Sequence, residues 1–368
     1  MPQRKSNMEL LRIFAMCLIV LFHCAYHSGF PSPNDVGLTP NMLTVKIFYF
    51  FGELGVNLFA LTTGYFQSKG RFKWEKLILL SAQVLFYSLL TNGINVLIGV
   101  LDFRGVAMRV GIFFPVIFTD YWFATAYVIV YLFSPYFNRL IEELDRKSFR
   151  NLLVTFFILY SAIPTFFGVL RGNTENWLYY NRAIWLAILY FTGAYIRRYS
   201  FPTLKSMKHA LIPALATFAL MTLSIPVIHA LNGAFHKSRE VAYFLFPNTA
   251  PMVLLSVGVF CAFLQLDIPY TPWINRVAST TFGIYLLHDS NVLRLWIWKT
   301  LLRFSEKINS PTLIPEILLA CAVIFLAGMV VDFARQALER VTLKKWLSSE
   351  RFQRLEARFD VNNTEKEP

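Results

Sequence analysis

Charged residues are scarce in this sequence. Asp, Glu, Lys and Arg make up 15% of its 368 residues, whereas a soluble globular domain carries about 25%. Hydrophobic residues account for 56%, and the mean hydropathy is +0.48. Because long apolar runs recur from end to end, the composition excludes a soluble domain with a single anchor and predicts an all-α polytopic membrane protein. It is also too apolar for a nucleic-acid-binding module, so we expect no nucleic-acid partner.

Signatures of several common sites are missing as well. There is no Walker-type or dinucleotide-binding glycine loop, no H-E-x-x-H and no G-x-S-x-G, so nothing in the sequence points to P-loop, zincin or serine-hydrolase chemistry. The cysteines form no C-x-x-C pair and have no metal-ligand spacing, so we expect buried thiols, no disulfide framework and no metal site. These residues are Cys17, Cys24, Cys261 and Cys321.

The net charge is +13, and the Lys and Arg residues cluster in short segments between the apolar runs. If the N-terminus is placed in the cytoplasm, the inner connections hold far more Lys and Arg than the outer ones, as the positive-inside rule requires. We therefore expect about ten transmembrane helices with both termini cytoplasmic. The predicted helices cover residues 8–29, 44–66, 75–101, 120–141, 151–170, 182–200, 208–231, 241–266, 277–303 and 312–338.

The two ends of the chain are expected to behave differently. The first apolar run is too long for a typical signal-peptide core and no A-x-A-like cleavage site follows it, so we expect a retained helix. Residues 1–340 are expected to form the membrane domain. Residues 341–368 mix basic and apolar side chains and predict an amphipathic tail on the lipid surface, disordered from residue 362. The stretch 109–118 predicts a re-entrant or interfacial piece.

Two polar residues lie on one face of the first predicted helix. His23 follows Arg12 by eleven residues, which returns to nearly the same face and rises roughly 16 Å. Arg12 and Glu9 form either a snorkelling ion pair or an anion site, because a guanidinium suits phosphate. His23 is either a structural histidine or a general base. His27, one turn further, is expected to be peripheral.

Other intramembrane polar residues extend this set of candidates. Glu53 either orients His23, binds substrate or pairs with Lys46 or another basic group, since a carboxylate in the membrane needs a cavity or a partner. Asn57 lies one turn beyond Glu53.

The later helices contribute three further candidates. Trp122 fits an interfacial aromatic belt as well as a site. Tyr285 and His288 lie three residues apart in the ninth predicted helix and form either an interhelical hydrogen-bonded pair or part of a polar path that contacts the substrate.

The spacing of Arg12 and His23 resembles the Arg/Lys-x10-His signature of acyltransferase family 3, a family of bacterial integral-membrane acyltransferases. Three further blocks resemble the family in order and spacing, so the resemblance covers most of residues 8–340. Within the family, the chain resembles the stand-alone type, which is similar to the O-acetyltransferase of enterobacterial common antigen. The blocks are Gly55-Val-Asn-Leu-Phe59 with Gly64-Tyr65, Tyr121-Trp-Phe123 with Tyr131 and Ser134-Pro135, and Thr281-Phe-Gly-Ile-Tyr-Leu-Leu-His288.

The resemblance implies a multi-pass protein of the bacterial plasma membrane that takes an acyl group, acetyl by resemblance, from cytoplasmic acyl-CoA. A hydroxyl of a cell-surface or lipid-linked polysaccharide would accept it on the far side. Acetyl-CoA would be a donor substrate, and no bound cofactor is implied. Arg12 matches the essential basic residue of the family and His23 its catalytic histidine. Asn57, Trp122 and Tyr285 are candidate donors to the thioester oxygen.

Two other classes of function fit parts of the sequence. In a polysaccharide exporter or transporter the same buried polar residues would line a path without acyl transfer, although we find no repeat of broken helices, which many transporters use. A membrane scaffold would rely on the basic tail and would leave the intramembrane Arg12 and His23 unexplained.

Overall fold

The protein consists of helices and the loops between them, and the computed structural model describes residues 5–100, 106–118, 120–171, 181–201, 204, 206–291 and 293–359. No strand occurs among these residues. In the first half the helices are α1 (Ser6–His27), α2 (Pro33–Val36), α3 (Pro40–Gln67), α4 (Trp74–Leu97), α5 (Val106–Phe113), α6 (Trp122–Glu143), α7 (Arg146–Phe157), the π-helical η1 (Ile158–Ala162) and α8 (Ile163–Arg171). In the second half they are α9 (Arg182–Tyr199), α10 (Met207–Ala234), the 3₁₀ turn η4 (Tyr243–Leu245), α11 (Ala250–Leu264), α12 (Pro272–Ala278), α13 (Thr281–His288), α14 (Leu293–Leu295), the π-helical η5 (Trp296–Leu301), the 3₁₀ turn η6 (Phe304–Lys307), α15 (Leu313–Val341), α16 (Leu343–Leu347) and α17 (Glu350–Arg358).

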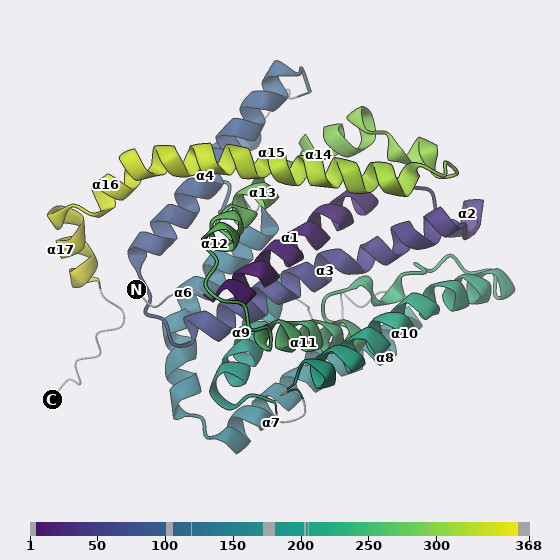
Figure 1. The fold of residues 1–368 in the computed structure, drawn as a ribbon, viewed down its shortest axis with the longest axis horizontal. Helices are drawn as coiled ribbons and strands as arrows, with labels where there is room; N and C mark the ends of the chain where they lie inside the picture. Colours follow the sequence, from purple (N-terminus) through teal and green to yellow (C-terminus); the bar gives the residue numbers. More distant parts are fainter. Residues whose placement is uncertain are drawn as a thin grey trace.

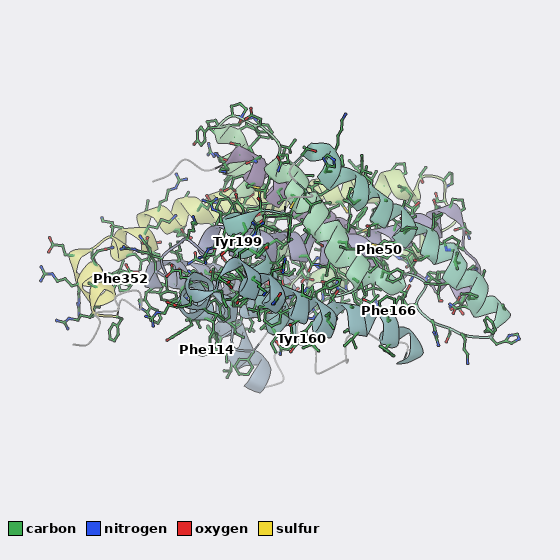
Figure 2. All side chains as sticks on the ribbon, turned by 90° about the horizontal axis from the view of Figure 1, so that it is seen from below. Phe50, Phe114, Tyr160, Phe166, Tyr199 and Phe352 are labelled. Atoms are coloured by element: carbon green, nitrogen blue, oxygen red, sulfur yellow. The ribbon has the colours of Figure 1, made fainter. Side chains whose placement is uncertain are left out.

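Helices α1 and α3 form the centre of the bundle (Figure 1). In α3, 67% of the most apolar stretch is buried, against 17% in α10 and 22% in α15. The outer helices therefore turn most of their apolar side chains outward, as lipid-facing helices do. Figure 2 labels one example of each setting: Phe166 on α8 is 73% exposed, whereas Phe50 on α3 is fully buried.

Glycines set how closely α3 approaches its neighbours. A Cβ atom on Gly55 would lie 2.7 Å from the carbonyl oxygen of Ala15 on α1. On the other side of α3, a Cβ atom on Gly193 of α9 would overlap the backbone of Leu61. Small residues of this kind allow helix backbones to approach in membranes. These close contacts fix the distance between α1, α3 and α9.

The all-α polytopic architecture predicted from the sequence is confirmed. Within the described residues, six helices are long and apolar enough to cross a membrane, and α11 is a shorter apolar helix. In Figure 1, α17 lies at one end of the molecule and α2 at the other, and α1 begins on the side nearer α17 and runs toward the side of α2. This arrangement agrees with both termini on one side of the membrane. That the side is cytoplasmic remains a prediction from the charge distribution.

Two of the predicted helices are wrong in extent. The eighth helix begins at Ala250 rather than near 241, because the residue before Pro247 is disfavoured in a helix and Pro251 suits the first helical turn. The ninth helix, expected to be continuous over 277–303, is broken into α12, α13, α14 and η5. At the first break, the Thr280 hydroxyl donates to the Val277 carbonyl at 2.7 Å, which competes with the helical pattern.

Smaller differences concern the cysteines and the tail. Cys17 is exposed, so the expectation of a buried thiol is wrong there, because Cys17 lies one turn from the exposed Phe14 on the same side of α1. The other three cysteines are buried, and all four are free. The tail is helical and docks against the start of α4, where the Trp74 indole donates to the Phe359 carbonyl at 2.9 Å. The end predicted to be disordered, residues 362–368, lies outside the described residues.

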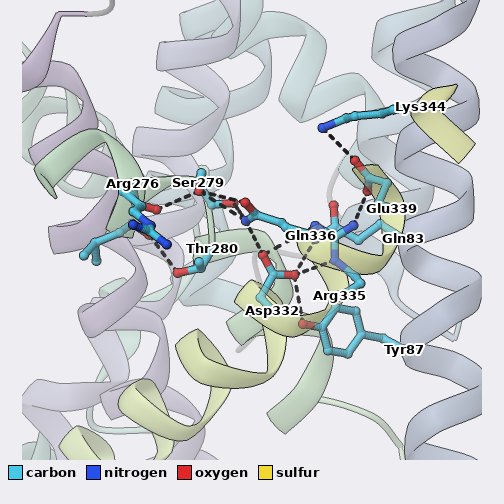
Figure 3. Close-up of polar contacts among 11 residues, drawn as sticks. Gln83, Tyr87, Arg276, Ser279, Thr280, Asp332, Arg335, Gln336, Glu339 and Lys344 are labelled. Atoms are coloured by element: carbon cyan, nitrogen blue, oxygen red, sulfur yellow. Dashed lines mark hydrogen bonds and ion pairs between the residues drawn. The ribbon is translucent and has the colours of Figure 1, made fainter. Parts of the chain in front are cut away.

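The half-helix α13 is anchored by a buried polar network (Figure 3). Asp332 of α15 is fully buried and accepts hydrogen bonds from Tyr87 of α4 at 2.9 Å, from Arg335 at 2.6 Å and from Gln336 at 2.8 Å. A Cβ atom on Gly283 of α13 would overlap the Asp332 carboxylate. Because a buried carboxylate requires such partners, the network fixes where α13 lies against α4 and α15.

We predict that Gly193→Ala destabilises the protein by about 1–3 kcal/mol, because the new methyl group must displace the backbone of α3. Thermal unfolding in detergent would show this as a lower midpoint. Gly93→Ala is the matched control, since a Cβ atom there meets nothing within 4 Å and alanine favours the helix. Equal midpoints for the two variants would contradict the close contact between α3 and α9.

Candidate active site

One cavity of about 1180 Å³ runs beside α1. Its wall includes Lys5, Arg12, Met16, His23 and His27, which follow one stripe of the helix. Lys5 and His27 are separated by roughly 33 Å of helix, close to the hydrocarbon thickness of a bilayer, about 30 Å. The prediction that Arg12 and His23 share one helix face is confirmed, and both line the same cavity.

Cations gather at the end of the cavity that holds Arg12. Lys5, Arg12, Lys76 of α4 and Arg197 of α9 line this part together with the Glu9 carboxylate. A concave surface lined by one sign of charge concentrates ligands of the opposite sign. This end of the cavity is therefore suited to a polyanion.

Arg12 is held in place by its own helix and by α13. Its Nη1 donates to Glu9 Oε2 at 2.8 Å, and its Nη2 lies 3.5 Å from the Thr281 hydroxyl. The Arg12 side chain is 27% exposed, and it lines the cavity. Both interpretations of the pair therefore describe part of the observation: the ion pair exists, and it orients a guanidinium that faces the cavity.

His23 is buried and hydrogen-bonded to His288. The His288 Nδ1 lies 2.6 Å from the Ile284 carbonyl oxygen, which only accepts, so Nδ1 carries a proton and the neutral ring leaves Nε2 as an acceptor. The His23 Nδ1 lies 2.8 Å from that acceptor and must donate to it. The His23 Nε2 is then left with a lone pair, which is the state a general base requires.

A carboxylate and a second histidine face this lone pair. Asp289, the residue that ends α13, places its Oδ1 3.7 Å from the Nε2 of His23 and 3.7 Å from the Nε2 of His27. The expectation that His27 is peripheral is wrong, because the side chain is 14% exposed and lines the cavity. Helix α13 ends at His288, so Asp289, the next residue, lies beside His23 and His27.

The sequence spacing predicted no metal site, yet the fold brings His23, His27 and Asp289 together with ligand atoms within 4.8 Å of one another. Arg294 places its Nη1 3.3 Å from Asp289 Oδ1. A fixed cation at that distance opposes a metal ion on the same carboxylate. We therefore assign no metal to this group of residues.

Three other predicted residues line the cavity wall: Glu53, Trp122 and Tyr285. The Arg182 guanidinium lies 4.1 Å from the centre of the Trp122 ring, a cation–π contact that holds both side chains. The Tyr285 ring lies 6.4 Å from that of His23 and is fixed by edge contacts with neighbouring aromatic residues.

Glu53 neither pairs with Lys46 nor orients His23. Lys46 binds both oxygens of Glu240, at 2.9 and 3.0 Å, and is thus engaged elsewhere. The ring of His23 is oriented by His288 and faces Asp289, so Glu53 does not orient it. A substrate contact by Glu53, or its pairing with another basic group, remains a prediction.

Asn57 and His288 lie behind the cavity wall. Asn57 is fully buried and donates to the Pro247 carbonyl and the Ser256 hydroxyl, while its oxygen accepts from the Trp185 indole at 3.0 Å. It therefore connects α3 to α9 and to the start of α11. The substrate contacts predicted for Asn57 and His288 would require both side chains to leave these positions.

Sequence reasoning missed several residues at the site. Asp289 directly follows the last quoted motif, and Arg294 comes five residues later. Asp289 lies one turn beyond Tyr285 on the same helix face, and this spacing is the signal that could have found it. The positive-inside rule alone accounts for Lys76 and Arg197 in the sequence, so nothing there marks them as site residues.

The fold and the cavity define an integral-membrane helical protein with a cationic cavity end and a buried, hydrogen-bonded pair of histidines. A family model described as an acyltransferase domain, that of acyltransferase family 3, matches residues 5–332. The chain therefore belongs to acyltransferase family 3, and it is a membrane acyltransferase. Comparisons with curated proteins and with solved structures gave no match.

We predict that His288→Phe lowers acyl transfer by about tenfold to a hundredfold, because the buried N–H of His23 loses its acceptor at a cost of about 1–3 kcal/mol. His288→Gln keeps an acceptor and should recover part of the rate. His209→Phe, at an exposed position on α10, is the control. If the Gln and Phe variants lose activity equally while both fold normally, His288 does not act through His23.

Proposed function

We propose that the protein transfers an acyl group, preferably acetyl, from cytoplasmic acyl-CoA to a hydroxyl of a cell-surface or lipid-linked polysaccharide. The bacterial plasma membrane is the proposed location. The observation that supports this most strongly is that Arg12 and His23 line one continuous cavity beside α1. It is cationic at the Arg12 end and, roughly 16 Å of helix further on, contains His23 with a free lone pair.

The donor fits the cationic end by charge. Coenzyme A carries several phosphate charges at one end of a long flexible arm and the thioester at the other. Arg12, Lys76 and Arg197 would hold the phosphates, and the arm would extend along α1 toward His23. Arginine forms bidentate hydrogen bonds to phosphate, and Glu9 already fixes the fork of Arg12.

The reaction then needs little more than a positioned base, because a thioester is already activated. The acceptor hydroxyl oxygen forms a bond to the acyl carbon while its proton passes to the Nε2 of His23. The carbon–sulfur bond breaks, and the thiolate leaving group takes that proton back from His23. The products are the ester and free coenzyme A. Tyr285, which lines the cavity near His23, is positioned to donate to the oxygen of the transition state.

The acceptor is proposed to enter from the other end of the cavity. Tyr26, Tyr49 and Glu240 line that end, and tyrosine combines an apolar ring with a polar hydroxyl. Acceptor hydroxyl and thioester would meet at His23, so the acyl group alone would cross between the two sides. The preference for acetyl and for a polysaccharide rests on the family resemblance.

We predict that His23→Ala lowers acyl transfer by about 10²- to 10⁴-fold, the usual contribution of a general base. The assay is transfer of labelled acetyl from acetyl-CoA to glycan in membranes that contain the full chain. His209→Ala is the control, because His209 is exposed on α10. Unchanged activity in a folded His23→Ala variant would overturn the assignment of the base.

We predict that Arg12→Ala mainly raises the KM for acyl-CoA, by about tenfold to a hundredfold, because charge-assisted hydrogen bonds contribute about 1.5–3 kcal/mol. Arg303→Ala is the matched control: this arginine also pairs with a glutamate three residues away, but it is 61% exposed and lies outside the cavity lining. Equal KM values for the two variants would contradict the phosphate site. Absence of acyl transfer by the unaltered protein would overturn the proposed function as a whole.

A further inference from the structure

We infer that Asp289, together with His23 and His27, binds two adjacent hydroxyls of the acceptor, so that the acceptor is a vicinal diol of the kind found in saccharides and other polyols. This inference rests on the proposed function, since it concerns the acceptor in that reaction. It adds a recognition site for the hydroxyl beside the one that is acylated.

The acceptor atoms of Asp289 and His23 face each other with no proton donor from the described residues between them. The 3.7 Å between Asp289 Oδ1 and the Nε2 of His23 exceeds a hydrogen bond. His23 presents a lone pair there, and a carboxylate accepts only. Two acceptors that face each other across this distance are satisfied together by two hydroxyl groups on neighbouring carbons. The hydroxyl on His23 is the one that reacts, and its neighbour donates to Asp289.

The carboxylate is held in place from two sides. The Asp289 backbone N–H donates to the Tyr285 carbonyl at 3.1 Å, which closes the end of α13. Arg294 lies 3.3 Å from Oδ1 and supplies the compensating charge. The Asp289 side chain is only 5% exposed. A buried carboxylate is stabilised by each further donor it accepts, and a ligand hydroxyl is such a donor.

His27 completes the site on the side away from His288. Its Nε2 lies 3.7 Å from the same Asp289 oxygen, and its ring centre lies 5.5 Å from that of His23. Because a histidine nitrogen can donate or accept according to its tautomer, His27 can contact the oxygen of either hydroxyl. A simple alcohol would leave Asp289 without its second donor.

Other ligands fit the group less well. A divalent cation would find three ligand atoms, but Arg294 repels it from the shared carboxylate. A cationic amine acceptor would meet the same repulsion. An acidic sugar would bring its carboxylate close to Asp289. An uncharged diol avoids all three conflicts, since it brings donors and no charge.

The test uses the full chain in membranes, acetyl-CoA as donor, and methyl α-glucopyranoside and its monodeoxy analogues as acceptor probes. Glycan isolated from cells that lack the protein serves as a further acceptor. We expect the analogue that lacks the hydroxyl beside the acylated one to react about tenfold or more slowly than the parent glycoside, as loss of a hydrogen bond to a charged group implies.

The variants separate recognition of the diol from a structural role of Asp289. In Asp289→Ala the parent and deoxy acceptors should react at similar rates, whereas Asp289→Asn, which keeps one acceptor oxygen, should give an intermediate ratio. Asp267→Asn, an exposed carboxylate beyond α11, should keep the ratio of the unaltered protein. If Asp289→Ala slows both acceptors by the same factor, the residue supports only the fold and the inference is overturned.

Three further outcomes would also overturn the inference. The first is equal transfer by the unaltered protein to parent and deoxy glycosides. The second is loss of activity with a chelator and recovery with zinc, which would mark a metal site. The third is transfer to the isolated glycan but to none of the glycosides. Transfer to no acceptor at all, glycan included, would instead overturn the proposed function.

Discussion

The rest of the site depends on the hydrogen bond between His23 and His288. The Ile284 carbonyl of α13 fixes the proton of His288, and His288 in turn fixes the proton of His23. Polar groups buried within a membrane protein must find partners inside it, and this chain of bonds meets that need for both rings. It also leaves one nitrogen of His23 without a proton, at the cavity. The hydrogen bond between the two histidines therefore satisfies both rings in the membrane and also leaves His23 able to act as a base.

That hydrogen bond requires α1 and α13 to lie at a fixed separation, and the surrounding fold supplies it. Gly55 brings α3 against α1, and Gly283 brings α13 against the Asp332 network of α15. Asp289 closes α13 on the Tyr285 carbonyl and, one turn beyond Tyr285, lines the same cavity. Close helix contacts and one broken helix together hold the base, the carboxylate and the guanidinium of Arg12 around a common space.

The sequence predicted the helical membrane fold and the common face of Arg12 and His23, because both follow from the apolar runs and from the helical period. The family resemblance agreed with both. Two features of the structure could not be predicted from the sequence. Hydrophobicity does not report a helix break when the residues on both sides are apolar, so 277–303 was predicted as one helix. Partners distant in sequence, such as His288 for His23 and Glu240 for Lys46, depend on packing that no local pattern encodes.

The central claim is that the donor lies along α1 with its phosphates at Arg12 and its thioester at His23. An experimentally determined structure of the full chain with a non-hydrolysable acetyl-CoA analogue would test it most directly. The account predicts phosphate oxygens within hydrogen-bond distance of Arg12 and the acyl carbon beside the Nε2 of His23. An analogue bound outside this cavity, or in it with the phosphates at the Tyr26 end, would contradict the account.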